Sequence, residues 1–126
     1  MSKRSDKEFT IDIKEASDRI ESYIQSMKYK DFLNDTKTQD AVVRNIEIIG
    51  EAVKNLTQNF KLQHKDIDWK KIAGMRDKII HFYFGVNLDV VWKTSKINIP
   101  ELNKKVKNII SEIENYQNPQ PDNSEI

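Results

Sequence analysis

The spacing of the apolar residues constrains this 126-residue chain more than any other feature of its sequence. In four long segments these residues recur at alternating steps of three and four, which places them in one stripe along an α-helix. The segments are roughly residues 6–29, 36–56, 69–85 and 100–116. Each stripe has to be buried against another helix, and no segment shows the alternation of a half-buried strand. We therefore predict an all-α, up-and-down bundle of four long helices with one or two short ones.

Local signals predict where the second and third helices begin. Thr36 and Gln39 have the spacing of a capping box, within a run of cap-forming residues that precedes the second apolar stripe. Residues 57–68 are polar and lack clear periodicity, so we expect a connection that can include one helical turn. Asp66 or Asp68 can cap the helix that follows.

The second half of the chain contains its own start and stop signals. Gly85 and Asn87 can end the third helix and cap a short one that covers residues 88–92. Pro100 suits the first turn of the last helix, where its missing N–H needs no intrahelical partner. After Tyr116 there are two prolines and no apolar pattern. We predict one domain over residues 1–116, followed by a flexible tail over residues 117–126.

Composition excludes several classes of function. Without cysteine there can be no disulfide, thiolate nucleophile or thiolate metal site. No group of His, Asp and Glu has metal-ligand spacing, so we expect neither a metal nor a cofactor. No apolar run approaches the roughly 18 residues of a membrane span, and the polar N-terminus lacks a leader, which predicts a cytoplasmic protein without membrane contact. The formal net charge is +1, so any contact with RNA must rest on a local basic patch.

The third predicted helix carries polar residues where packing would favour apolar ones. On an ideal helix Arg76 and Tyr83 lie inside or beside the buried arc and share one face. An arginine is rarely buried unpaired, so Arg76 needs a carboxylate, a phosphate or a subunit cleft. His81 is five residues after Arg76, about 140° around the helix, so one straight helix cannot aim both side chains at one point. A distorted helix end near Gly85, or a symmetric dimer that packs two copies face to face, would bring them together.

These residues also have ordinary structural interpretations. A single histidine on a helix, such as His81, is more often a surface or interface residue than a catalytic one. Arg76 could form an ion pair with a glutamate of the bundle, and Tyr83 could lie at the edge of the core with its hydroxyl in water. Four lysines lie near this segment: Lys70, Lys71, Lys78 and Lys93. They could contact the phosphates of an RNA backbone or could belong to a solvated helix face.

Residues 74–85, GMRDKIIHFYFG, resemble the R-x-x-x-x-H-x-Y signature of HEPN toxins of the HepT family. Arg76, His81 and Tyr83 occupy the motif positions, and Asp77 stands where the family commonly has a polar residue. Two flanking segments also resemble the family, IIGEA at residues 48–52 in the second helix and IDWKKI at residues 67–72 before the motif. The resemblance extends over residues 9–116.

The resemblance implies a metal-independent ribonuclease in which the 2′-hydroxyl of RNA is the nucleophile. His81 would act as general base or acid, a role that suits a group with an unperturbed pKa of about 6.5. Arg76 would hold the scissile phosphate and the charge that grows on it, and Asp77 would orient one of the two. Taken with the geometry above, this predicts an active homodimer whose cleft draws residues from both chains.

The resemblance also implies a partner, a minimal nucleotidyltransferase (MNT) antitoxin that transfers AMP from ATP onto Tyr83. That modification would add bulk and negative charge, which would pair with Arg76 and repel RNA. Two other interpretations remain open. The chain could be a non-catalytic HEPN scaffold of the nucleotidyltransferase, with Arg76 binding a nucleotide phosphate, or it could be a non-enzymatic helical protein with a structural arginine.

Overall fold

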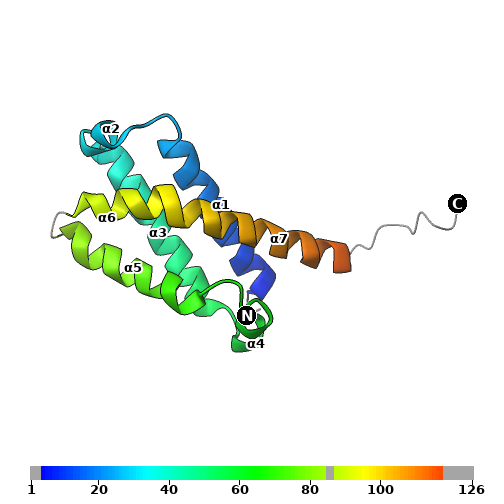
Figure 1. Ribbon diagram of the computed structural model, residues 1–126. Coiled ribbons are helices and arrows are strands. Elements are labelled where there is room, and N and C mark those ends of the chain that lie inside the picture. The colour runs from blue at the N-terminus through cyan, green and yellow to red at the C-terminus, as the bar shows by residue number, and fades with distance from the viewer. Residues whose placement is uncertain (1–3, 85–86, 118–126) are drawn as a thin grey trace, which may run out of the picture.

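Four long helices form the body of the protein in the computed structural model, which describes residues 4–84 and 87–117 (Figure 1). Within these ranges the side chains of residues 80–84 and 117 lie outside the described part. The long helices are α1 (Asp6–Ile24), α3 (Thr36–Asn55), α5 (Trp69–Phe84) and α7 (Ile99–Gln117). The described residues contain no strand. The structure thus confirms the predicted all-α bundle.

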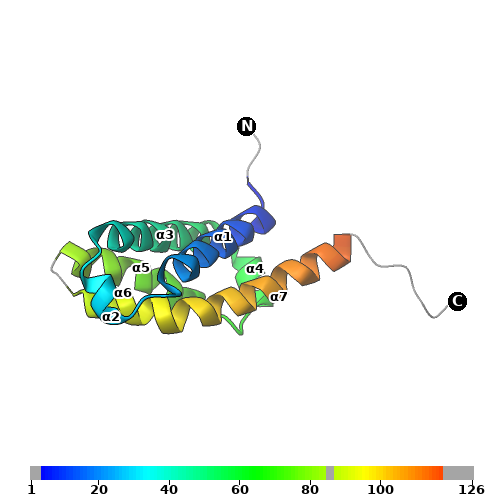
Figure 2. The ribbon, with the colours of Figure 1, turned by 90° about the horizontal axis from the view of Figure 1, so that it is seen from above.

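The long helices lie next to one another in the order α7, α1, α3, α5. α1 packs against both α3 and α7, and α3 also packs against α5. Figure 2 shows α1 and α3 on one side of the bundle and α7 on the other, with the C-terminal end of α7 extending past its neighbours. None of the described helices combines the length and apolar character that crossing a membrane would need.

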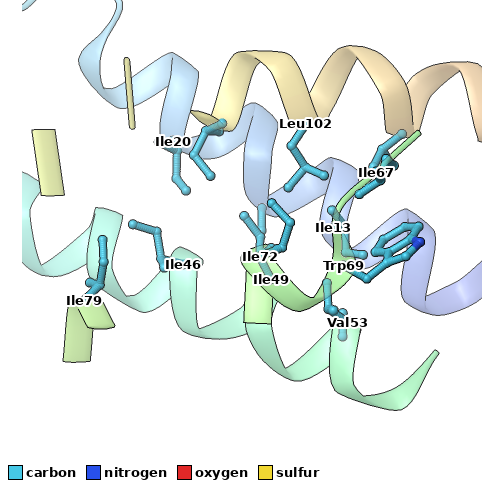
Figure 3. Close-up of a cluster of buried hydrophobic side chains, with 14 of the residues drawn as sticks. Ile13, Ile20, Ile46, Ile49, Val53, Ile67, Trp69, Ile72, Ile79 and Leu102 are labelled. Carbon is cyan, nitrogen blue, oxygen red and sulfur yellow. The ribbon is translucent and has the colours of Figure 1, made fainter. Parts of the chain in front are cut away.

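Isoleucines from all parts of the bundle dominate the core. Figure 3 shows Ile13 and Ile20 of α1, Ile46 and Ile49 of α3 and Leu102 of α7 converging on one cluster, and each of these side chains is buried. The same cluster includes Ile72 and Ile79 of α5. Burying this much apolar surface is the dominant favourable contribution to folding. It also holds α5 against α3, which positions the candidate site.

The short elements outnumber the one or two that we predicted. They are α2 (Tyr29–Leu33), α4 (Gln58–Gln63), α6 (Leu88–Lys93) and a five-residue π-helical turn, η1 (Thr94–Asn98). The predicted end of the first helix near Tyr29 is wrong, because α1 ends at Ile24 and α2 follows. The reason lies in the core, where Phe32 of α2 is fully buried with its ring centroid 5.2 Å from that of Trp92. A continuous α1 could not deliver Phe32 to that position.

The predicted capping box at Thr36 does not form. Asp35 is the N-cap of α3, and its Oδ1 accepts a hydrogen bond from the N–H of Thr38 at 3.0 Å. Gln39 instead donates from Nε2 to the carbonyl of Phe32 at 2.9 Å, which ties α3 to α2. A buried amide needs a partner, and the carbonyl end of α2 supplies one that sequence spacing alone does not reveal.

The predicted signals around α5 and α6 are confirmed where the structure describes them. Asp68 Oδ1 accepts from the N–H of Lys71 at 3.0 Å at the start of α5, and Asn87 is the N-cap of α6. Gly85, the predicted stop signal, lies outside the described residues.

The last long helix begins one residue earlier than predicted, at Ile99, with Pro100 in its first turn. The N–H of Ile99 donates to the carbonyl of Thr94, five residues back, as in a π-helix. In a regular α-helix the ring of Pro100 would crowd the carbonyl of Lys96, and the wider π turn lies where that crowding would occur. Residues 118–126, most of the predicted tail, lie outside the described residues.

Candidate active site

Arg76 lies in the middle of α5 with its side chain directed at α3. Its guanidinium is held by two carboxylates: Nη1 is 2.9 Å from Oδ1 of Asp77, and Nη2 is 3.1 Å from Oε1 of Glu51 on α3. Lys54, one turn after Glu51, places Nζ 3.6 Å from the same oxygen of Asp77. We call these four residues, Glu51, Lys54, Arg76 and Asp77, the Arg76 cluster.

Burial differs strongly within the Arg76 cluster. The side chain of Arg76 is only 23% exposed, whereas those of Glu51 and Asp77 are 58% and 60% exposed. The Nε atom of Arg76 is buried and has no hydrogen-bond partner. The stem of the arginine packs closely against Gly50 of α3, while the hydrogen bond from Nη1 to Asp77 is exposed. A guanidinium has five N–H donors in a planar fork, so the terminal nitrogens retain capacity for an oxyanion ligand.

The pKa of Asp77 is lowered, chiefly because its carboxylate accepts a hydrogen bond from Arg76 and secondarily because of the charge of Lys54. Asp77 is consequently ionised throughout the neutral range. The cluster then combines two cations with two anions. The formal charge of the Arg76 cluster is therefore zero. An anion would be directed to Arg76 by the orientation of its N–H donors and not by a net positive charge.

α5 continues as an α-helix through the positions of His81 and Tyr83 and ends at Phe84. The side chains of both residues lie outside the described part of the structure. The backbone register nevertheless separates position 81 from Arg76 by about 140°, whereas position 83 shares the face of Arg76 two turns further on. The structure gives the backbone from Trp69 to Phe84 as one uninterrupted α-helix.

The four lysines proposed for RNA contact occupy different parts of the surface. Lys71 and Lys78 line a groove of about 440 Å³ between α5 and the α6–α7 side of the bundle, with Met75 and Leu102 among its apolar lining. Arg76 does not line this groove. Lys70 is exposed on α5, and Lys93 forms an ion pair on α6 with Asp89, with Nζ 3.1 Å from Oδ2. The structure brings Lys71 and Lys78 together but does not place them with Arg76.

The described side chains contain no set of three or more His, Cys, Asp or Glu residues that could hold a metal ion. Within the described ranges, the chemistry near Arg76 is that of a guanidinium, an ammonium and two carboxylates.

A family model of ribonucleases described as HepT-like matches residues 13–109, a range that contains the whole Arg76 cluster and positions 81 and 83. The chain belongs to the ribonuclease HepT-like family. It is 50% identical over 107 residues to a protein of Thermococcus cleftensis named "Probable ribonuclease HepT", and the match covers 85% of this chain and 97% of that one. A protein of Methanocaldococcus jannaschii, whose name gives it as a candidate RNase, is 45% identical over 90% of this chain and 94% of its own length. No solved structure matches the chain significantly.

Sequence reasoning about this HepT-like chain missed the contribution of α3 to the site. Glu51 and Lys54 hold Arg76 and Asp77 from the neighbouring helix, but neither was identified as a site residue. One feature of the sequence could have indicated that α3 contributes to the site. Gly50 interrupts an otherwise strong helical pattern, and a glycine inside a helix usually has a packing or functional reason.

Proposed function

We propose that this HEPN-type ribonuclease is the toxin of a toxin–antitoxin pair and cleaves RNA without a metal ion at a cleft formed by two copies of the chain. One observation carries the proposal: Arg76 is held by two largely exposed carboxylates, on the helix that carries the His and Tyr positions of the family motif. Membership of a ribonuclease family makes RNA the substrate class to test.

The proposed reaction uses the RNA itself as the nucleophile. A general base removes the proton of the 2′-hydroxyl, and the 2′-oxygen attacks the adjacent phosphorus. The bond to the 5′-oxygen breaks, and that oxygen takes a proton from a general acid, which leaves a cyclic phosphate and a 5′-hydroxyl. Arg76 would donate hydrogen bonds to the non-bridging oxygens, where negative charge grows. His81 would act as the general base or the general acid in these proton transfers, and Asp77 would keep the guanidinium of Arg76 oriented.

We base the proposed dimer on the register of α5. Positions 76 and 81 lie about 140° apart on a regular helix, so they belong to different faces of α5. A twofold axis beside α5 would place position 81 of each chain toward Arg76 of the other, and such isologous interfaces are the commonest in soluble oligomers. The composite cleft would then contain two equivalent sites.

The proposed partner is a minimal nucleotidyltransferase antitoxin that transfers AMP onto Tyr83. Position 83 shares the helical face of Arg76, so a phosphate attached there would come within reach of the guanidinium. The added charge would occupy Arg76 and repel the RNA backbone, which explains how the modification would silence the toxin.

Cleavage is tested with the purified chain and a mixed RNA substrate in the presence of a chelator. We expect the wild-type chain to produce fragments with cyclic phosphate ends, and we expect His81→Ala to lose about 10²–10⁴-fold in rate, the usual contribution of a general acid or base. Induced expression of the wild type should arrest growth, whereas His81→Ala should not. A wild-type chain that leaves both RNA and growth untouched would instead favour the scaffold function.

Modification is tested by co-expressing the chain with a minimal nucleotidyltransferase of the proposed antitoxin class. Mass spectrometry should locate AMP on Tyr83, and the modified protein should bind RNA more weakly than the unmodified one because of charge repulsion. Tyr83→Phe retains the ring without the acceptor hydroxyl and should stay unmodified and toxic in the presence of the antitoxin. Neutralisation of Tyr83→Phe as complete as that of the wild type would contradict this part of the proposal.

A further inference from the structure

Gly50 of α3 stands opposite Arg76 of α5 at a point of very close helix approach. A Cβ atom added at residue 50 would lie within 3.0 Å of the Cβ, Cγ and Cδ atoms of Arg76, a separation that real side chains essentially never show. The stem of Arg76 therefore occupies a notch that only a glycine leaves open. Glycine is unfavourable inside a helix, so its presence in the middle of α3 calls for a packing reason, and this notch supplies one.

The next residue along α3 holds the other end of the same side chain. Oε1 of Glu51 is 3.1 Å from Nη2 of Arg76, while Nε, between the stem and the terminal nitrogens, is buried without a hydrogen-bond partner. A buried, unpartnered N–H is unfavourable. The missing hydrogen bond at Nε is therefore a cost of the arrangement. A functional need for the terminal nitrogens to stay in this position would explain why the cost is tolerated.

We propose that Gly50 and Glu51 are positioning residues for Arg76: the notch at Gly50 sets the depth of the arginine stem, and Glu51 sets the direction of the guanidinium. Neither residue touches the RNA in this scheme. The catalytic significance of the arrangement rests on the proposed ribonuclease function, whereas the packing of Arg76 against Gly50 does not.

A methyl group at residue 50 cannot coexist with the stem of Arg76 as it lies, so either the stem swings outward or α3 and α5 separate. In both cases the terminal nitrogens move and Nε becomes accessible to water. A displacement of about 1 Å in a catalytic group can lower a rate about 10²-fold.

The chain provides a matched control on the facing helix. Gly74 of α5 is also a glycine inside a long helix, but a Cβ added there meets no atom within 4 Å. Gly74→Ala adds the same methyl group as Gly50→Ala and changes helix propensity in the same favourable direction. The two variants therefore differ in whether the added methyl meets Arg76.

The first measurement is steady-state RNA cleavage, with folding checked by circular dichroism at the assay temperature and the oligomeric state by light scattering. We expect Gly50→Ala to lower kcat about 10–100-fold with KM changed less than about threefold, and Gly74→Ala to stay within about twofold of the wild type. A merely structural role for Gly50 would reduce the folded fraction and leave kcat per folded molecule unchanged. Such a result would overturn the proposal.

The second measurement does not depend on RNA. Exchange of the Arg76 Nε–H with water, followed by NMR of 15N-arginine-labelled protein, should be slow in the wild type and in Gly74→Ala, because Nε is buried. It should be at least about tenfold faster in Gly50→Ala, because exchange reports exposure of the group. Unchanged exchange in a folded Gly50→Ala would refute the notch, whatever the activity. An inactive wild type with this exchange pattern would instead contradict only the ribonuclease function.

A third variant covers the case in which Gly50→Ala does not fold. Glu51→Gln keeps the size of an exposed side chain and removes the charge that holds Nη2, so it should fold like the wild type. We expect its kcat to fall about tenfold, and Glu51→Asp to recover part of the loss because it restores the carboxylate. Equal kcat for Glu51→Gln and the wild type would contradict the role assigned to Glu51.

Discussion

Replacing Arg76 with alanine is expected to lower the rate of RNA cleavage by about 10²–10³-fold, the usual effect of removing one donor to a charge that develops in a transition state. The variant should fold, because the carboxylates that Arg76 leaves behind, those of Glu51 and Asp77, are both more than half exposed and can be hydrated. The measurement is kcat/KM on a defined RNA, with the unfolding midpoint of both proteins as the folding check.

Arg76→Lys is the matched variant, because it keeps the positive charge and most of the stem but replaces the planar fork with a single ammonium. It should retain RNA binding better than cleavage, since a lysine neutralises a phosphate without the bidentate geometry of a guanidinium. If Arg76→Lys and Arg76→Ala both cleave at the wild-type rate, Arg76 is not the phosphate-holding group and the proposed site is wrong.

The pKa of Asp77 gives a second measurement for the Arg76 variants. This pKa is lowered mainly by the hydrogen bond from Arg76, so Arg76→Ala should raise that pKa toward the ordinary aspartate value of about 3.9. Because the pKa is lowered in the folded protein, the linked stabilisation is complete above the ordinary value and is lost as the pH falls through the lowered one. Asp77 is too exposed for this linkage to matter greatly to stability. Its titration, followed by NMR, serves as a local reporter of where the guanidinium lies.

Replacing Phe32 with alanine is expected to destabilise the fold by about 3–5 kcal/mol, the range for removing a fully buried aromatic side chain. The ring of Phe32 lies against that of Trp92, which in turn is 5.9 Å from the ring of Tyr29, so the cavity would open between α2 and α6. Urea unfolding at fixed protein concentration measures the loss, which is a large fraction of the 5–15 kcal/mol typical of a whole domain.

Leu33 supplies the control for Phe32. It is the next residue of the same short helix and is 43% exposed, so Leu33→Ala should change the free energy of unfolding by less than about 1 kcal/mol. A Phe32→Ala variant as stable as Leu33→Ala would mean that α2 does not anchor the bundle. In that case the early end of α1 would need another explanation.

Much of the fold could be predicted because helical periodicity is a local property. The stripe from Phe9 to Ile24 and the corresponding stripes of α3, α5 and α7 each indicate a helix without reference to the others. The residues at which the helices begin and end were harder to predict from the sequence. The packing of Phe32 against Trp92 and the hydrogen bond from Gln39 to α2 depend on contacts between elements, whereas the Asp35 cap of α3 is a local contact with Thr38.

The sequence by itself determined the four apolar stripes, the absence of thiol chemistry and the motif positions 76, 81 and 83, because spacing and residue type are properties of the chain alone. It also showed that Arg76 would need a partner, since a guanidinium beside a buried arc cannot stay unpaired. Only the tertiary structure decided that this partner is Glu51, that Lys54 steadies Asp77 and that Gly50 makes room for the arginine stem. These contacts depend on which faces of α3 and α5 meet, and how closely, which follows from burial of the whole core and not from any one segment.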